Sequence, residues 1–168
     1  MRRVAVTGLG AVTPIGNDVA TTWSSAVEGR SGVDFIRSFD ASGFPVRIAA
    51  EVKDFVPEEW IDKREVRRMD LYAQYALAAT EMAMKESGLP IGKDKPQGYV
   101  PEKVGVIIGS GIGGLGSLEE QHKKALEKGF DRLSPFFILQ MIINMAPGLV
   151  TIKYGCKGPN WSPVSDVA

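Results

Sequence analysis

The 168-residue chain contains a single cysteine and a single histidine. One cysteine excludes an internal disulfide, and chains without disulfides are typical of a reducing cytoplasm, so we expect a cytoplasmic protein. No apolar run approaches the ~20 residues that a transmembrane helix needs. The first residues, MRRVAV, lack the apolar region and cleavage site of a signal peptide. We therefore expect no membrane partner.

An excess of charge of either sign is also missing. Lys+Arg and Asp+Glu both number 20, so the overall charge does not indicate a nucleic-acid partner. Hydrophobic residues make up 44% and charged residues 24%, which is close to the globular average and excludes a disordered tail. The length suits one ordinary domain, and no repeat or low-complexity tract interrupts it.

The most informative stretch is Lys103–Gly116, KVGVIIGSGIGGLG. Its apolar run at 104–108 is rich in β-branched residues and predicts a strand buried on both faces, as in a parallel sheet. Five glycines follow within eight residues, and glycine lets another backbone or a ligand approach closely. Ser117 and Glu120 then match a capping box at a helix start. Strand, glycine turn and helix make half of an α/β unit.

The glycines also match the dinucleotide fingerprint G-x-G-x-x-G, in two registers that begin at Gly109 and Gly111. A pattern that fits in two registers is weak. The acidic residue expected about 20 residues on could be Asp131, but it follows Gly129-Phe130 in a turn and not an apolar strand. The alternative is a close-packed turn beneath a different kind of site.

The remaining patterns predict strands and helices in alternation. In chain order these are a strand at 4–7, a helix capped by Asn17-Asp18 and closed by Gly29, a half-buried strand at 46–53, a helical turn at 57–60, a helix at 70–87 ended by Gly88, the strand and helix around 104–128, an apolar segment at 136–143, and a helix from Asn144 to Tyr154. The long helix should bury Tyr72, Tyr75, Ala76, Ala79, Met82 and Ala83 in the core. We expect a mostly parallel α/β layer. The tail from Gly155 should add a strand, which Pro163 disfavours.

Several motifs together resemble a β-ketoacyl-acyl carrier protein synthase of type II, the long-chain condensing enzyme. They are VAVTGLGAVTPIGN, GRSG at 29–32, RRMDLYAQYAL, GVIIGSGIGGLGSLEEQ, LSPFFILQMIINMAPG and TIKYGCKGPN, which span nearly the whole chain in order. The resemblance implies a thiolase-like fold of two similar α/β halves. Residues 1–168 correspond to the N-terminal domain, incomplete and truncated before the helix of the nucleophile.

The resemblance also implies what catalysis would need. The family's T-A-C-[TAS] signature, whose cysteine is the nucleophile, falls on Ser165–Ala168, and Val167 stands in the place of that cysteine. Valine has no nucleophilic atom, so we expect no catalytic residue here. The two family histidines and the second oxyanion-hole amide belong to the other half. We expect His122 to lie on the surface, and Cys156 to lack an activating base.

Binding residues can still be carried over from the family. Ile112 matches an isoleucine that gates the acyl pocket, and Phe137 and Ile138 match pocket residues that reach toward the partner subunit of a homodimer. Alternatively, all three are ordinary apolar core. The family's basic docking surface for acidic acyl carrier protein matches Lys63, Arg64, Arg67, Arg68, Lys124 and Arg132. Asp131 replaces a residue that is usually basic, and a solvated charged face is the alternative reading.

The leading hypothesis is therefore a fragment of a 3-oxoacyl-acyl carrier protein synthase, which condenses an acyl thioester with malonyl carrier in fatty acid elongation. We expect this chain alone to be inactive, with no cofactor and no metal. Its expected partners are acyl carrier protein and a second subunit, either another copy or a full-length synthase. One alternative is a non-catalytic protein that binds carrier or pairs with a subunit, and another is the product of a frameshifted gene.

Overall fold

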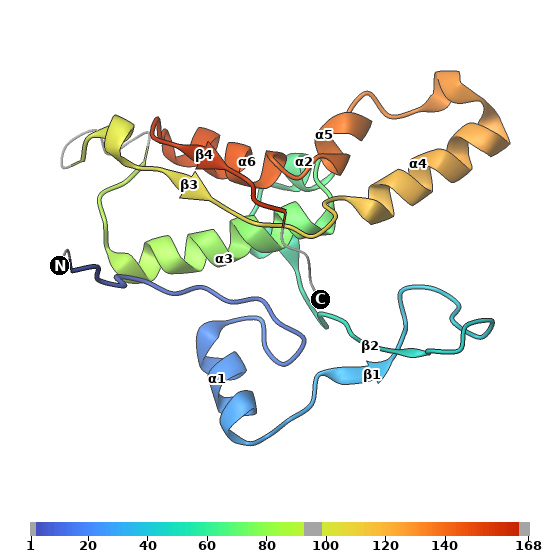
Figure 1. The fold of residues 1–168 in the computed structure, drawn as a ribbon, viewed down its shortest axis with the longest axis horizontal. Coiled ribbons are helices and arrows are strands. Elements are labelled where there is room, and N and C mark those ends of the chain that lie inside the picture. The colour runs from blue at the N-terminus through green and yellow to red at the C-terminus, as the bar shows by residue number, and fades with distance from the viewer. Residues whose placement is uncertain (1–2, 93–98, 165–168) are drawn as a thin grey trace.

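The computed structural model describes residues 3–92 and 99–164 (Figure 1). The α-helices are α1 (Val19–Val27), α2 (Lys63–Val66), α3 (Leu71–Ser87), α4 (Leu115–Lys128), α5 (Phe137–Met141) and α6 (Met145–Tyr154). The strands are β1 (Val33–Phe35), β2 (Ile48–Ala50), β3 (Val106–Ile107) and β4 (Asn160–Trp161), and 3-10 turns occupy Pro57–Glu59, Pro101–Lys103 and Phe130–Arg132. Within the described ranges, no helix has both the length and the apolar character needed to span a bilayer.

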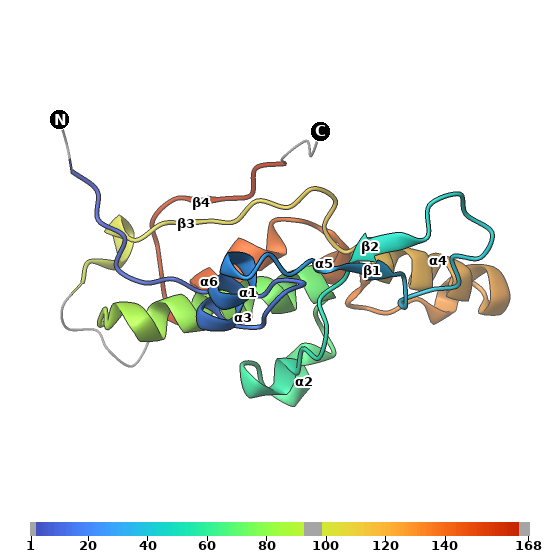
Figure 2. The same ribbon diagram turned by 90° about the horizontal axis from the view of Figure 1, so that it is seen from below.

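The core lies between α3 and α6. Ala73 and Ala146 are at most 2% exposed, and their small side chains allow the two helices to pack closely. Leu77 and Val150 fill the space along the same contact. Figure 2 shows β3 and β4 on one side of this helix pair and α2 on the other. The neighbouring elements are therefore arranged around the α3–α6 pair.

The face of α3 that packs most tightly is not the face that the sequence analysis predicted. The buried residues are Ala73, Gln74, Leu77 and Ala78, whereas the predicted stripe from Tyr72 to Ala83 is only half-buried. The helix is apolar on most of its circumference, so the periodicity did not distinguish the two stripes. Gln74 is tolerated in the core because its amide donates to the carbonyl oxygens of Met69 (3.0 Å) and Val66 (3.3 Å).

The expected mostly parallel sheet is present in part. Strands β3 and β4 pair in parallel, with Val106 opposite Asn160, so the strand predicted in the tail forms despite Pro163. Strands β1 and β2 form a separate antiparallel pair, with Val33 opposite Ala50. The first of these, β1, lies between the helix closed by Gly29 and the strand predicted at 46–53, where the sequence analysis predicted no strand. Strand β3 is not buried on both faces, because Ile107 is 61% exposed.

The predicted strand at 4–7 is extended backbone without a ladder partner among the described residues. It runs along α3, where Gly8 and Gly10 face the carbonyl oxygens of Ala83 and Ala79 so closely that a Cβ at either glycine would overlap them. Leu9 N donates to the carboxylate of Glu86. Contact with a helix thus replaces the sheet pairing expected for a strand at 4–7.

Helix ends follow the local sequence well. Asp18 caps α1, accepting from Thr21 N at 2.7 Å. Gly88 and Gly155 end α3 and α6 in the left-handed region, with φ of 61° and 69°, where glycine pays no Cβ penalty. The capping box at Ser117 is wrong: α4 begins at Leu115 after Gly114, and no side chain of its own caps it.

Candidate functional site

The glycine turn, residues 109–114, connects β3 to α4 and lies against the end of α5. Gly113 has φ +80°, and a Cβ at Gly113 or Gly114 would overlap the carbonyl oxygens of Met141 and Gln140. Gly114 N donates to Met141 O at 3.0 Å. Glycine is required here because two backbones meet without room for a side chain.

Several amides of the turn region are already engaged in hydrogen bonds, which bears on the dinucleotide interpretation. Gly113 N donates to Ser110 Oγ at 3.0 Å, and Ser117 N donates to Asp70 Oδ2 at 2.9 Å. A phosphate cradle needs such amides free to point at a ligand. Asp131 lies in the 3-10 turn at 130–132 after α4 and not at a strand end. The geometry is that of the close-packed turn, the alternative that the sequence analysis left open.

Helix α3 begins beside the glycine turn and is tied to the start of α4, which follows that turn. Asp70 caps α3 with one carboxylate oxygen, and its other oxygen accepts from Ser117 N and from Ser117 Oγ, the latter at 2.6 Å. The Tyr72 hydroxyl donates to Ile142 O at 2.5 Å, just beyond α5. Burial, with Asp70 nearby, raises the pKa of Tyr72 to about 12. The phenol therefore remains a donor at neutral pH.

The predicted acyl-pocket residues lie on the two segments that meet at this turn. Ile112 is in the turn and is 67% exposed, and Ile138 in α5 is 54% exposed. Phe137, at the start of α5, is half-buried. The structure thus places the three residues on adjoining segments. Exposure of Ile112 and Ile138 argues against ordinary apolar core for these two residues in the chain as described.

A hollow of about 460 Å³ lies beside the glycine turn. Residues 10–13 form one wall, Ile108–Ser110 another, and α3 contributes Tyr72, Tyr75, Ala76 and Ala79. Sequence reasoning assigned these α3 residues to the core and did not associate them with a site. It also missed Asp70. The sequence did contain a signal for Asp70: it is an acidic residue that follows a basic run and directly precedes a predicted helix.

The predicted docking residues form one cluster and two outliers. Lys63 and Arg64 lie on α2 and Arg67 and Arg68 follow it; all four are exposed. We call residues 63–68 the basic segment. The segment contacts α5 and its flank: the guanidinium of Arg68 is 5.1 Å from the ring centroid of Phe136, and Gln140 Nε2 donates to Arg67 O at 3.3 Å. Lys124 on α4 and Arg132 in the following 3-10 turn lie at the far end of α4.

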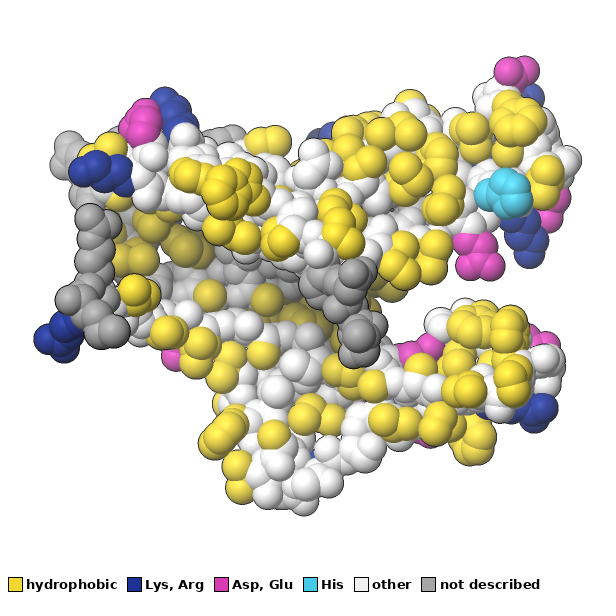
Figure 3. Space-filling model, in the orientation of Figure 1, with side chains coloured by type: hydrophobic (Ala, Val, Ile, Leu, Met, Phe, Trp, Pro, Cys, Tyr) yellow, Lys and Arg dark blue, Asp and Glu magenta, His cyan; other side chains and the backbone are white. Residues whose placement is uncertain are grey.

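The two remaining candidates for a chemical role are Cys156 and His122. Cys156 is buried, and its burial raises the pKa of the thiol, which disfavours the thiolate that nucleophilic attack requires. His122 is exposed on α4, as expected, and appears in cyan in Figure 3. Val167 lies outside the described residues. Among the described residues, no group of three His, Cys, Asp or Glu side chains could hold a metal ion.

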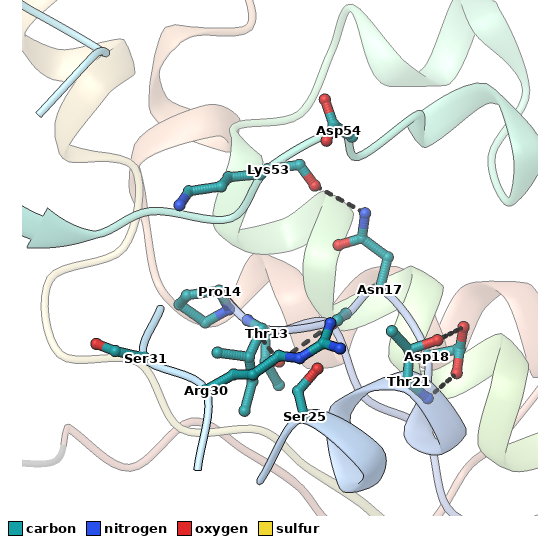
Figure 4. A pocket seen from close by; sticks show the side chains of 12 residues that line it. Thr13, Pro14, Asn17, Asp18, Thr21, Ser25, Arg30, Ser31, Lys53 and Asp54 are labelled. Carbon is teal, nitrogen blue, oxygen red and sulfur yellow. Dashed lines mark hydrogen bonds between the residues drawn. The ribbon is translucent and has the colours of Figure 1, made fainter. Parts of the chain in front are cut away.

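A second, polar pocket lies at the start of α1 (Figure 4). Asn17 donates its amide N–H to Lys53 O at 2.8 Å, while its Oδ1 is buried with no hydrogen-bond partner in the described part of the chain. The cations at its rim are already paired, Arg30 with Glu28 and Lys53 with Asp34. This balance of charge gives the pocket no preference for an anion, and it shares no residue with the glycine turn.

Comparison with known proteins identifies the same family as the sequence motifs. The sequence model described as "Beta-ketoacyl synthase, N-terminal domain" matches residues 1–168. A 3-oxoacyl-[acyl-carrier-protein] synthase 2 of Staphylococcus aureus strain COL is 45% identical over 167 residues, which cover 99% of this chain and 39% of that protein. The protein of the same name from Coxiella burnetii is 46% identical over 164 residues and is covered to 38%. The chain thus spans about two fifths of the length of these relatives.

Solved structures confirm the thiolase-like fold. The ishigamide ketosynthase/chain length factor matches with a TM-score of 0.79 at 26% identity, over 94% of this chain and 38% of that one. A type II PKS acyl-carrier protein in complex with its ketosynthase matches with a TM-score of 0.72 at 26% identity, over 94% and 40%. A β-ketoacyl synthase from Burkholderia phymatum matches with a TM-score of 0.72 at 23% identity, over 96% and 40%, and bears on the fold alone.

Proposed function

Since the chain belongs to the β-ketoacyl synthase family through its N-terminal domain, we propose that it is part of a 3-oxoacyl-[acyl-carrier-protein] synthase II. Such an enzyme moves an acyl chain from its carrier to a cysteine, decarboxylates malonyl carrier, and joins the two by attack of the carbanion on the thioester. The observation that carries the proposal is the 45% identity over 99% of the chain to synthases of that name. Fatty acid elongation is then the process in which the complete protein acts.

Within this function, the glycine turn and α5 form one wall of the acyl pocket. Ile112, Phe137 and Ile138 supply its apolar surface, in keeping with the exposure of Ile112 and Ile138. The hollow beside the turn, with Tyr72 and Tyr75 on α3, extends that wall. An acyl chain is recognised by apolar area and not by charge, and burial stabilises it by roughly 25 cal/mol per Å².

The basic segment is the docking site for acyl carrier protein. Its four cations are exposed and follow one another within six residues, where they can meet an acidic partner. Lys124 and Arg132 extend the surface along α4. Rim charges of this kind raise the rate of encounter more than the affinity. Their effect is screened over ~8 Å at physiological salt, so docking should weaken strongly as salt rises.

Titration of acyl carrier protein at low and high salt tests the docking. We expect binding at low salt that is largely lost at high salt and in Arg67→Glu with Arg68→Glu. The matched control is Arg30→Glu with Arg37→Glu, the same charge change far along the chain from the basic segment. Binding that ignores both salt and the Arg67/Arg68 change would exclude the basic segment as the docking site.

We further propose that this chain by itself does not condense acyl and malonyl groups. The support is Val167, at the position that the resemblance assigns to the nucleophile, and the burial of Cys156. Incubation with an acyl carrier substrate, followed by intact mass measurement, should reveal no acyl adduct. An adduct that hydroxylamine removes would contradict this, and peptide mapping would show whether Cys156 carries it.

A second candidate function is pairing with a subunit. It is favoured by large apolar side chains that remain exposed, such as Phe35 at 70% and Trp23 at 70%. Contiguous apolar patches above a few hundred Å² are rare on soluble monomers. Sedimentation of the dilute chain, alone and with a full-length synthase, distinguishes a monomer from a self-associated chain and from a chain paired with the full-length synthase.

A further inference from the structure

Asp70 differs from the other helix-capping carboxylates in where its hydrogen bonds go. Asp18 bonds only within its own helix start, to Thr21 N at 2.7 Å and Thr21 Oγ at 2.8 Å. Asp62 likewise accepts from Arg64 N at 2.8 Å. The bond of Asp70 to its own helix is long, at 3.4 Å, whereas its bonds to Ser117, 47 residues later, measure 2.9 and 2.6 Å. The stronger partners of this carboxylate therefore belong to α4.

These bonds supply what α4 lacks locally. The first four N–H groups of a helix have no partner within the helix, and α4 has no side-chain cap of its own. Asp70 accepts from one of these amides, and its negative charge lies near the positive end of the helix dipole. A charge-assisted bond of this kind is about twice as strong as a neutral one. Asp70 thus acts as a cap for two helices at once.

The same short stretch of chain also holds α5. Tyr72 donates to Ile142 O at 2.5 Å, and Arg67 O accepts from Gln140 Nε2 at 3.3 Å. The glycine turn lies between these attachments, and Gly114 N is bound to Met141 O. Residues 67–72 therefore contact α5 and its flank, near Phe137 and Ile138, and the start of α4, directly after the glycine turn that carries Ile112. Arg67 and Arg68 are also the end of the basic segment.

We propose that Asp70, through Ser117, is a positioning residue that sets where the glycine turn presents Ile112, and that it links this position to the basic segment. The relevance to acyl binding rests on the proposed function, but the geometric claim does not. If Asp70 is removed, α4 loses its cap, and the turn keeps only its backbone bonds to Met141 O and Pro163 O among the attachments described. If the basic segment is displaced by a partner, Asp70 transmits the displacement to Ser117.

The first test follows the methyl signal of Ile112 by NMR in the 168-residue chain with labelled isoleucine methyls, assigned with Ile112→Val. Asp70→Ala should shift or broaden this signal and speed amide exchange at Ser117 by about tenfold, as expected for a lost bond to a charged group. Asp70→Asn keeps an acceptor oxygen and should retain the signal. Ser117→Ala should shift it less, and the double variant Asp70→Ala with Ser117→Ala should add nothing to Asp70→Ala.

The matched control is Asp18→Ala, which removes a capping carboxylate from α1, far along the chain from both the glycine turn and the basic segment. A purely structural role of Asp70 predicts that both caps, when lost, disturb the chain alike. An Ile112 signal that is unchanged in Asp70→Ala, or changed equally in Asp18→Ala, overturns the proposal. If Asp70→Ala does not fold, Ser117→Ala decides, and an unmoved Ile112 signal there is equally contradictory.

The second test adds acyl carrier protein bearing its phosphopantetheine group. In the unsubstituted chain and in Asp18→Ala, we expect binding to shift the Ile112 signal; in Asp70→Ala, binding should persist without that shift. Binding that leaves Ile112 unmoved in the unsubstituted chain overturns the link to the basic segment. Failure of the carrier to bind any variant counts against the proposed function and against that link, while the first test still decides the positioning role.

Discussion

The helical body, residues 61–156, and the N-terminal region, residues 3–52, have similarly apolar sequences but differ in what their side chains contact. In the body, Leu77 and Val150 are at most 5% exposed between α3 and α6. In the N-terminal region, Val6, Phe35 and Ile48 are more than half exposed. Figure 1 shows β1 and β2 projecting away from α3, and Figure 3 shows the apolar side chains that they display.

This difference shows that apolar pattern and burial are separate properties. Alternation at 46–52 correctly indicated a strand, yet both members of the β1–β2 pair present apolar residues outward. A two-stranded pair has no second layer of its own, so it is marginal without packing from elsewhere. The body has that layer, because α6 covers α3. We therefore expect global stability to reside in the body.

Truncation of a core leucine should show the largest effect. Leu77→Ala removes a side chain that is 5% exposed, and we expect it to lower the free energy of unfolding by about 2–5 kcal/mol. The same change at Leu9, which is 53% exposed in the N-terminal region, should cost less than about 1 kcal/mol. Urea unfolding followed by circular dichroism measures both. Equal losses would mean that the two regions unfold as one unit.

A methyl group added at a glycine tests close packing in the same two regions. A Cβ at Gly114 would overlap Gln140 O, so we expect Gly114→Ala to cost about 1–3 kcal/mol. Gly43, between β1 and β2, has open space around its Cα, and Gly43→Ala should stay within about 0.5 kcal/mol of the unsubstituted chain. Thermal unfolding of the two variants side by side is sufficient. A harmless Gly114→Ala would show that the glycine turn can move away from α5.

Acid titration should show which of the two regions contributes to the pH dependence of the free energy of unfolding. Burial raises the pKa of Glu81, but bonds from Lys153 and Tyr154 outweigh it and leave the pKa below the ordinary 4.5. A lowered pKa gives stability that is present above pH 4.5 and is lost as pH falls through the folded value. Glu81→Gln should therefore flatten the loss of stability between neutral pH and pH 3.

Asp34, in β1, is the matched control for that titration. A bond from Phe35 N, with Lys53 and Arg37 nearby, also lowers the pKa of Asp34. Because Asp34 lies in the marginal β1–β2 pair and is only half-buried, Asp34→Asn should leave the pH dependence of global unfolding unchanged. Urea midpoints measured from pH 7 to pH 3 compare the two variants. A flattening by Asp34→Asn would place β1 within the cooperative unit.

The smallest expected change in stability concerns the exposed strands themselves. Phe35→Ser combined with Ile48→Ser should alter the free energy of unfolding by no more than about 0.5 kcal/mol. It should nonetheless reduce self-association and the binding of a dye specific for apolar surface, because both side chains are more than half exposed. Sedimentation and dye fluorescence report on this. A marked loss of stability would show that the pair packs on the body in solution.

Several parts of the fold and site could be predicted from the sequence because short-range chemistry controls them. Asp18 caps the start of α1 and Gly88 ends α3, both as predicted, and the glycine turn follows a strand as expected. The capping box at Ser117 failed for a long-range reason: Asp70, 47 residues earlier, takes both of its donors. Local pattern cannot indicate a cap that arrives from another helix.

The sequence by itself determined the family and the positions of most helices, since these depend on neighbouring residues and on motifs in order. Only the tertiary structure decided that the glycine turn is close-packed, which stripe of α3 is buried, and that the basic segment and the glycine turn both lie near α5. The physical reason is that α3 is apolar on most sides, so the partner α6 selects the buried face. That selection leaves Asp70 free to hold the start of α4, directly after the glycine turn, and Tyr72 free to hold Ile142, directly after α5.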